Sequence, residues 1–167
     1  MKLLAIRHAI AEESEDFART GKDDRLRPLT DEGRKKMKQA AKGLRELVPG
    51  IDLLATSPLT RAAQTGAILD SVYGGVDEVE IEELAPEATP AEFLLWLRKQ
   101  KAGTLAVVGH EPSLSLIVSW LLTGSERRIF AFRKGGACML EFPGEVAAGT
   151  ATLLWALAPA QLRDLAD

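Results

Sequence analysis

The residues of this chain best suited to chemistry stand where short apolar runs end. Residues 3–6 are apolar and lead at once into Arg7 and His8, and the apolar residues 105–108 are followed two positions on by His110. Runs this short with polar neighbours are typical of buried strands, and ligands of open α/β sheets bind outside the carboxyl ends of the strands. A lone histidine is more often structural or exposed. Because both histidines of the sequence follow such runs, we predict that they face one binding site.

A further strand end offers a hydroxyl group and a second arginine. The apolar residues 51–55 run into Ser57 and Pro58, which suit the N-cap and first position of a helix expected over residues 58–73. The unpaired N–H groups of that first turn can receive an anion. An exposed position is the commoner fate of a lone helix arginine, but Arg61 lies one turn from a strand end, so we predict that it binds the anion.

Together these strand ends describe a pocket for a dianionic tetrahedral group. The guanidinium forks of Arg7 and Arg61 match phosphate oxygens in pairs and would hold the charge that develops on them during transfer. A neutral imidazole among them can attack phosphorus and form a phosphohistidine intermediate that water later breaks. In a flat strand, Arg7 and His8 would point to opposite faces. The chain must therefore bend here if both are to meet one phosphate.

Other routes to phosphoryl or acyl chemistry find less support. The sixth position after Cys138 is Gly144 instead of the arginine that a cysteine phosphatase needs. The chain has neither a P-loop nor a Gly-x-Ser-x-Gly elbow. No spacing of histidines and cysteine predicts a zinc site, and we predict neither a metal nor a cofactor. A magnesium site of carboxylates alone stays open, although no pattern indicates one.

Strands alternate with helices along the chain, which predicts an α/β fold with a mostly parallel sheet covered on both faces. The last third is richer in strands and suggests antiparallel additions at one edge. The further expected strands lie at 79–84, 104–108, 129–132, 137–142 and 150–158, and the further helices at 30–48, 91–101, 113–122 and 159–166.

Residues 10–29 are polar and without a period. A connection this long inside a domain is usually functional or mobile. Because it follows His8 directly, we expect it to lie over the same site, and for its first half a disordered surface loop is the alternative.

The composition is that of an ordinary globular chain. Of the 167 residues, 46% are hydrophobic and 27% charged, and with no dividing linker we expect a single domain over residues 1–167. The net charge of −3 gives no sign of a nucleic-acid partner.

A single cysteine fits a reducing compartment. The first strand begins too early for a signal peptide, and no apolar run reaches the ~20 residues needed to cross a bilayer. We therefore expect a cytoplasmic protein without a membrane partner.

The motifs at these strand ends resemble those of a known family. The Arg-His pair alone is a weak signal. The segments given below follow the order of that family's motifs over two-thirds of the chain, and together they are highly specific. Ala9 replaces the usual glycine of the Arg-His-Gly signature of the histidine phosphatase superfamily, which narrows the freedom of the backbone. The similar segments are Leu4-Ala5-Ile6-Arg7-His8-Ala9, Arg27-Pro28-Leu29-Thr30 with Gly33, Thr56-Ser57-Pro58-Leu59-Thr60-Arg61-Ala62-Ala63-Gln64-Thr65, and Gly109-His110-Glu111-Pro112. The residue sequences of these segments resemble those of the small bacterial phosphohistidine phosphatases of the SixA type.

The resemblance implies a three-layer α/β/α fold of the phosphoglycerate mutase-like kind and dephosphorylation without a metal. It implies that His8 is the nucleophile, with Arg7, Arg61 and His110 binding the phosphoryl group. We add Ser57 as a substrate-binding candidate, because it stands at the same strand end as Arg61.

The acid that protonates the leaving group is left open. Phosphomonoesterases of this superfamily use a carboxylic acid, and Glu83, near the end of the third strand, resembles its position. Glu80, Glu82 and Glu87 surround it, so a solvated acidic cluster is the alternative. A protonated imidazole leaves readily, whereas an alkyl phosphate needs a delivered proton. A phosphohistidine substrate would therefore need little help from Glu83.

The short segment before the fourth strand bears on the substrate. About twenty residues follow Leu84 before that strand, most of them in a predicted helix, where larger relatives insert a lid. An open pocket suits a phosphorylated side chain on a protein surface. We therefore expect a phosphorylated protein as substrate, such as a histidine phosphotransfer domain, and leave the oligomeric state open. The alternatives are a broad small-molecule phosphomonoesterase and a non-catalytic phosphate-binding module. Ile10, Ala11 and the missing lid disfavour a phosphoglycerate mutase.

Overall fold

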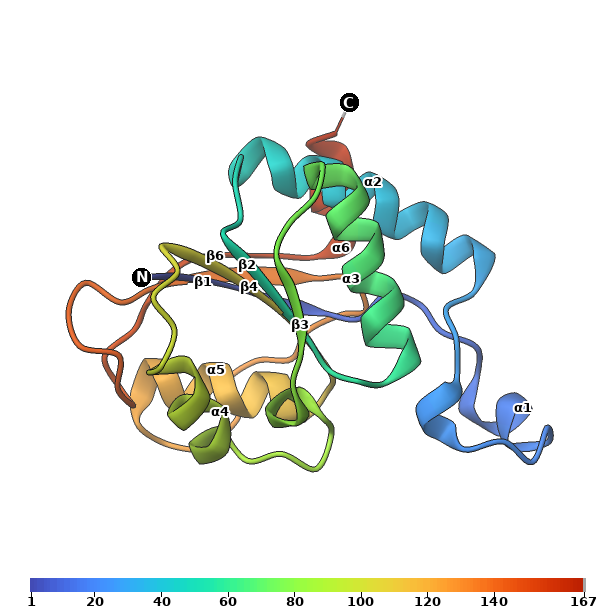
Figure 1. Ribbon diagram of the computed structural model, residues 1–167, viewed down its shortest axis with the longest axis horizontal. Coiled ribbons are helices and arrows are strands. Elements are labelled where there is room, and N and C mark those ends of the chain that lie inside the picture. The colour runs from blue at the N-terminus through green and yellow to red at the C-terminus, as the bar shows by residue number, and fades with distance from the viewer. Residues whose placement is uncertain (167) are drawn as a thin grey trace.

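The computed structural model describes residues 1–166, in which six strands form one sheet between two layers of helices (Figure 1). This is the predicted three-layer α/β/α architecture. The strands are β1 (Lys2–Arg7), β2 (Leu53–Thr56), β3 (Glu78–Glu80), β4 (Thr104–Gly109), β5 (Ala137–Glu141) and β6 (Thr152–Leu157). The helices are α1 (Ser14–Ala18), α2 (Asp31–Leu47), α3 (Thr60–Tyr73), α4 (Pro90–Leu97), α5 (Ser113–Thr123) and α6 (Pro159–Asp164), with short 3-10 helices η1 (Asp24–Leu26) and η2 (Glu82–Leu84).

The strand order of the sheet is β3-β2-β4-β1-β5-β6. β1, β4, β2 and β3 pair in parallel, whereas β5 is antiparallel to both β1 and β6. The prediction of a mostly parallel sheet with antiparallel additions at one edge is confirmed. Because β1, β4 and β2 are parallel neighbours, their carboxyl ends open at the same edge of the sheet.

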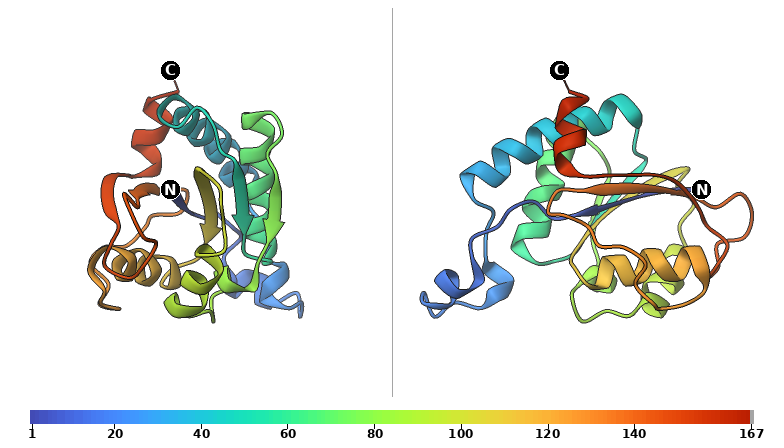
Figure 2. Two further views of the ribbon diagram at one scale, coloured as in Figure 1. Left: turned by 60° about the vertical axis from the view of Figure 1, so that its left-hand side comes forward. Right: turned by 180° about the vertical axis from the view of Figure 1, so that it is seen from behind.

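Successive side chains of β1 face opposite helix layers. Leu3 and Ala5 belong to the cluster that includes residues of α4 and α5, whereas Leu4 and Ile6 belong to the cluster of α2, α3 and α6. Figure 2 shows the two helix layers on either side of the sheet. Fully burying one such leucine or isoleucine stabilises a fold by roughly 1.5–3 kcal/mol. Burial on both faces therefore holds β1, and the residues that follow it, in a fixed position.

Two element boundaries differ from the predicted ones at the site. β3 ends at Glu80 rather than at residue 84, because its partner β2 ends at Thr56 and the chain turns into η2. The helix expected from residue 58 begins at Thr60. The reason is that the N–H of Ser57 donates to the carbonyl oxygen of Val108 at 3.0 Å, which extends the sheet pairing by one residue.

Residues 129–132 do not form the predicted strand. The edge of β5 is already paired with β6, and the carbonyl oxygen of Phe132 accepts a hydrogen bond from Nη1 of Arg7 at 2.7 Å. The rings of Phe130 and Phe132 lie 5.0 Å apart, so these apolar residues pack together as a loop. The apolar pattern reflects the packing of these two rings, and both sides of β5 are already paired, with β1 and with β6.

The long connection over residues 10–29 is an ordered segment with α1 and η1, and Figure 1 places it beyond the carboxyl end of β1. The N–H of Glu12 donates to the carbonyl oxygen of Pro28 at 2.9 Å, and that of Thr30 to Ile10 at 3.0 Å, so its two ends are held together. Phe17 is buried inside it. The alternative of a disordered surface loop is therefore excluded, and residues 10–29 form a structured segment.

Helices long and apolar enough to cross a bilayer are absent from residues 1–166.

Candidate active site

The carboxyl ends of β1, β2 and β4 come together as the sequence predicted. The N–H of His8 donates to the carbonyl oxygen of Gly109 at 3.0 Å, which fixes the end of β1 beside the end of β4. A cavity of about 290 Å³ opens at this edge. It is lined by Arg7, His8, Glu13, Ser14, Arg27, Arg61, Pro86, His110, Glu111 and Lys134. Four predicted site residues, Arg7, His8, Arg61 and His110, thus share one cavity.

The chain leaves the sheet immediately after His8. β1 ends at Arg7, and the N–H of Ala9 donates to Oγ1 of Thr65 on α3 at 3.0 Å. The Thr65 hydroxyl in turn donates to the carbonyl oxygen of Arg61 at 2.7 Å. This end of the strand is the bend that the sequence predicted. Because of it, Arg7 and His8 can line the same cavity.

The hydrogen bond of the His8 ring fixes its tautomer. Nδ1 of His8 lies 2.7 Å from the carbonyl oxygen of Ala9. A carbonyl oxygen only accepts, so Nδ1 carries the hydrogen and donates it. Nε2 is consequently left with its lone pair in a residue that is 5% exposed. An imidazole held in this way is chemically able to act as a nucleophile through Nε2.

His110 lines the cavity and contacts the buried Ser57 behind it. Nε2 of His110 and Oγ of Ser57 are 2.8 Å apart, and the Ser57 hydroxyl also accepts from the N–H of Leu59 at 3.3 Å. Ser57 therefore caps a turn before α3 and positions His110, whereas the N-cap of α3 is Leu59. Ser57 is fully buried and does not line the cavity.

Burial lowers the pKa of both imidazoles. Desolvation is the main cause for His8, whose pKa falls to about 3 although its bond to Ala9 acts in the opposite direction. Desolvation also dominates at His110, whose pKa falls to about 2, and the positive charges of Arg61 and Arg27 add to the effect. Both rings are therefore neutral near neutral pH.

The two predicted arginines present buried donors that no protein group satisfies. Nη1 of Arg7 donates to Phe132, and Nη1 of Arg61 donates to the carbonyl oxygen of Asp24 at 3.1 Å. Within residues 1–166, the Nε atoms of both arginines are buried donors without a hydrogen-bond partner, and Nδ1 of His110, whose role depends on the tautomer, also lacks one. Buried donors of this kind are costly unless an acceptor completes them. An oxyanion in the cavity is an acceptor of the right charge.

Arg27 and Asp24 belong to the site and were not among the predicted site residues. Nε of Arg27 donates to Oδ1 of Asp24 at 2.8 Å, and Oδ2 of Asp24 lies 3.4 Å from Nη1 of Arg61. The hydrogen bond from Arg27 is the main cause of a lowered pKa of Asp24. One carboxylate thus holds two guanidinium groups at the cavity. The signal was present in the motif around Arg27, whereas Asp24 carried no distinguishing pattern.

The predicted acid Glu83 lies apart from the cavity. It stands on η2 and lines a separate depression with Glu87, Trp96 and Lys99. The carboxylates that line the cavity are instead Glu13 and Glu111. Both Glu111 oxygens are held by Ser115, through its N–H at 3.1 Å and its hydroxyl at 2.9 Å. The placement of Glu83 gives no support to its predicted role.

Across residues 1–166, no three side chains of the metal-binding types His, Cys, Asp and Glu come close enough together to share an ion. The absence of a metal from the reaction stays a prediction.

Comparison with known proteins identifies the family. The model of the histidine phosphatase superfamily, branch 1, matches residues 3–88, slightly more than half of the chain. The chain belongs to the histidine phosphatase superfamily. An uncharacterised protein of Picosynechococcus sp. is 33% identical over 139 residues, which cover 81% of this chain and 82% of that protein. The phosphohistidine phosphatase SixA of Escherichia coli is 25% identical over 170 residues, with 98% and 97% covered.

Solved structures share the fold over almost the whole chain. The protein histidine phosphatase SixA complexed with tungstate superposes with a TM-score of 0.82 at 21% identity, covering 97% of this chain and 99% of that chain. The alpha-ribazole phosphatase of Shigella flexneri gives a TM-score of 0.75 at 18% identity, with 95% and 97% covered. The predicted phosphoglycerate mutase-like fold of the SixA type is confirmed.

Proposed function

We propose that this protein is a phosphohistidine phosphatase that acts on phosphorylated proteins through a histidine nucleophile. The observation that carries the proposal is the His8 ring, which donates from Nδ1 to Ala9 and keeps Nε2 unprotonated inside a cavity lined by arginines. A mere phosphate-binding module needs cations but no such imidazole. The non-catalytic alternative is therefore disfavoured.

In the first step, Nε2 of His8 attacks the phosphorus of the substrate. A P–N bond to His8 forms while the P–N bond of the substrate phosphohistidine breaks, and the substrate imidazole leaves with its proton. Arg7 and Arg61 donate to the equatorial phosphoryl oxygens, where charge builds up in the transition state. His110, held by Ser57, supplies a further donor.

In the second step, water attacks the phosphohistidine of the enzyme. The new O–P bond replaces the P–N bond to His8, the proton released by the water passes to solvent, and the products are inorganic phosphate and free His8. The cations of the cavity again hold the charge of the transferred group. Because the leaving groups of both steps are imidazoles, neither step depends on a strong acid.

A protein substrate fits the open segment beside the cavity. Between η2 and β4 the chain forms the single helix α4, and Pro86 is the residue of this segment that lines the cavity. We propose a single domain without a lid insertion, so that a side chain on a protein surface can enter. The similarity to SixA of Escherichia coli supports the same substrate class. The cytoplasmic location stays a prediction.

A broad small-molecule phosphomonoesterase is the second candidate. Glu13 and Glu111 line the cavity and could deliver a proton to an alkyl leaving group. The fold is also shared with an alpha-ribazole phosphatase. Alkyl phosphates need that proton, so their turnover separates the two candidates.

The test incubates the purified protein in EDTA with a phosphohistidine-bearing protein and, separately, with an alkyl phosphate. We expect phosphate release from the first alone, and an acid-labile phosphorylated enzyme on rapid quenching. His8→Ala should lose both signals. Equal release from both substrates would favour the phosphomonoesterase, and activity retained in His8→Ala would contradict the histidine mechanism.

A further inference from the structure

A second cavity adjoins the candidate active site. Its volume is about 230 Å³, and Ala9, Lys134 and the ends of α2 and α6 form its walls. Ala9 follows His8 directly, and Lys134 lines both cavities. We name it the flanking cavity. A ligand held there would lie beside a group held at His8.

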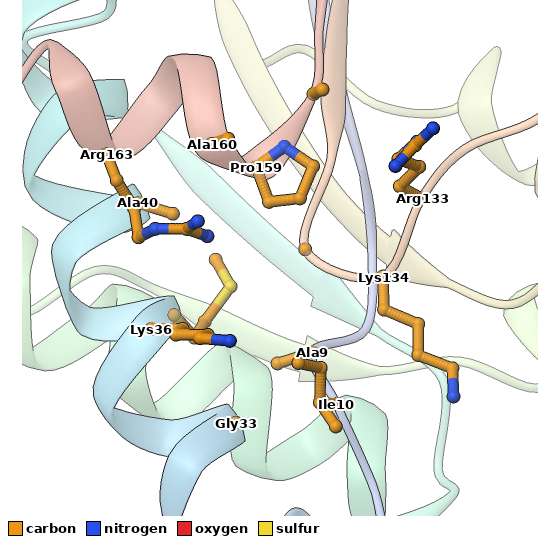
Figure 3. Close-up of a pocket in the computed structure, with 13 residues that line it drawn as sticks. Ala9, Ile10, Gly33, Lys36, Ala40, Arg133, Lys134, Pro159, Ala160 and Arg163 are labelled. Atoms are coloured by element: carbon orange, nitrogen blue, oxygen red, sulfur yellow. The ribbon is translucent and has the colours of Figure 1, made fainter.

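The flanking cavity has an apolar floor and a cationic rim. Figure 3 shows Lys36 and Arg163 on one side and Arg133 and Lys134 on the other. Between them lie the apolar side chains of Ala9, Ile10, Ala40 and Pro159, and Met37 also lines the cavity. A chain of net charge −3 thus gathers four cations around one cavity. Such a site suits a ligand that carries both carboxylates and apolar surface.

Little within residues 1–166 neutralises this rim. Lys36 pairs with Glu32, and this lysine side chain is still 42% exposed. Within residues 1–166, neither Arg133 nor Lys134 has a carboxylate within salt-bridge distance. The pair at Lys36 is solvated, and exposed pairs of this kind contribute little to stability. Carboxylates of a partner can therefore compete for these groups.

We infer that the flanking cavity binds the acidic surface around the phosphohistidine of a protein substrate. The inference rests on the proposed function, and it names what distinguishes a protein substrate from a small one. A small phosphate ester fills only the cavity at His8. A protein whose phosphohistidine enters there lays its neighbouring residues over Ala9, Ile10 and the cationic rim. Complementary charge at this place selects partners and speeds their association.

The test compares three probes: phosphoramidate, a phosphohistidine peptide with glutamates on both sides, and the same peptide with glutamines. We expect wild-type kcat/KM to be about 3- to 10-fold higher for the glutamate peptide, the size expected of a few exposed ion pairs. The double variant Lys36→Glu/Arg163→Glu should bring this ratio to about one or below. Its turnover of phosphoramidate should equal that of wild type. Added salt should shrink the wild-type ratio.

The matched control is Lys35→Glu/Lys38→Glu. Both residues are exposed on α2, neither lines the flanking cavity, and the change in net charge is the same. We expect this control to keep the wild-type ratio. Circular dichroism and thermal unfolding confirm that each variant folds, and Lys36→Gln/Arg163→Gln should give an intermediate ratio.

The outcomes separate the two proposals. A wild-type ratio near one, a ratio unchanged in Lys36→Glu/Arg163→Glu, or an equal loss in the control would overturn the flanking cavity as a docking site. Hydrolysis of phosphoramidate and of the glutamine peptide would meanwhile leave the phosphatase proposal standing. Absence of turnover with all three probes would overturn both.

Discussion

The imidazole rings of His8 and His110 lie with their centroids 5.1 Å apart and their planes tilted by 52°. Both rings are buried and stand beside cationic guanidinium groups. A second positive charge on either ring would face repulsion as well as loss of hydration. The positive charge of the site therefore lies on the arginines, and the two imidazoles are neutral.

The first prediction is a rate that tolerates acid. Because the pKa of His8 is lowered to about 3, its lone pair persists well below the usual histidine range. We expect kcat at saturating substrate to change by less than about threefold between pH 7.5 and 5. A histidine of ordinary pKa, about 6.5, would lose about tenfold per unit below that value. Such a decline, measured with phosphoramidate, would contradict a neutral buried His8.

The second prediction concerns stability, and its sign follows from the same pKa values. Below pH 6.5 the unfolded chain protonates both histidines, whereas the folded chain keeps them neutral down to about 3 at His8 and about 2 at His110. The unfolded state binds more protons in this window, so the free energy of unfolding falls as the pH falls. The slope is on the order of 1.4 kcal/mol per pH unit for each histidine.

Urea unfolding between pH 7.5 and 5 measures this slope. His110→Gln removes one titrating group, so we expect its stability to depend on pH more weakly than that of wild type. Equal slopes for the two proteins would show that His110 titrates alike in the folded and unfolded states.

The third prediction tests the link between His8 and Arg61. Thr65 is fully buried and joins them by accepting from the N–H of Ala9 and donating to the carbonyl oxygen of Arg61. Thr65→Val leaves the Ala9 N–H without a partner, which costs about 1–3 kcal/mol. We expect lower unfolding free energy and lower kcat. Thr65→Ser keeps the hydroxyl and should retain most of both, and equal losses in the two variants would point to the lost methyl group instead.

The fourth prediction separates the carboxylates. Glu83 lines a depression outside the cavity, whereas Glu13 and Glu111 line the cavity itself. We expect Glu83→Gln to change hydrolysis of both alkyl phosphate and phosphohistidine by less than about twofold. General acid catalysis contributes about 10²- to 10⁴-fold, so any alkyl phosphate turnover should fall on that scale in Glu13→Gln or Glu111→Gln. A large loss in Glu83→Gln alone would restore the role predicted from the sequence.

Much of this site could be predicted because it depends on local order along the chain. An apolar run that is buried on both faces must be a strand, and the residue after it must emerge at the sheet edge. This reasoning placed His8 and His110 in adjacent positions. The helix expected from residue 30 is also present as α2, and the hydroxyl of Thr30 caps it by accepting from the N–H of Gly33. Because these strands pair in parallel, their carboxyl ends lie together, and no further information is needed to predict this.

The predictions failed where a residue's environment depends on a distant partner. Ser57 has the chemistry of an N-cap, but its N–H is taken by β4 and its hydroxyl by His110. Glu83 resembles the acid in its sequence position, yet β3 is too short to carry it to the sheet edge. Asp24 lies in a segment without a period, and only the folded chain shows that it holds Arg27 and Arg61. These are tertiary contacts that no local pattern encodes.

The fifth prediction concerns the packing that supports the flanking cavity. Gly43 lies in the middle of α2, where replacing glycine by alanine normally stabilises a helix by about 0.5–1 kcal/mol. A Cβ at this position would meet the carbonyl oxygen of Leu162 at 1.7 Å, so α6 would have to move away. We expect Gly43→Ala to destabilise the protein by about 2 kcal/mol or more in urea and to weaken the preference for the glutamate peptide, because α6 carries Arg163.

The control is Gly144→Ala, where a Cβ would meet nothing within 4 Å. It should leave the stability and the peptide preference unchanged. A Gly43→Ala protein as stable as wild type would show that α6 does not need its close approach to α2.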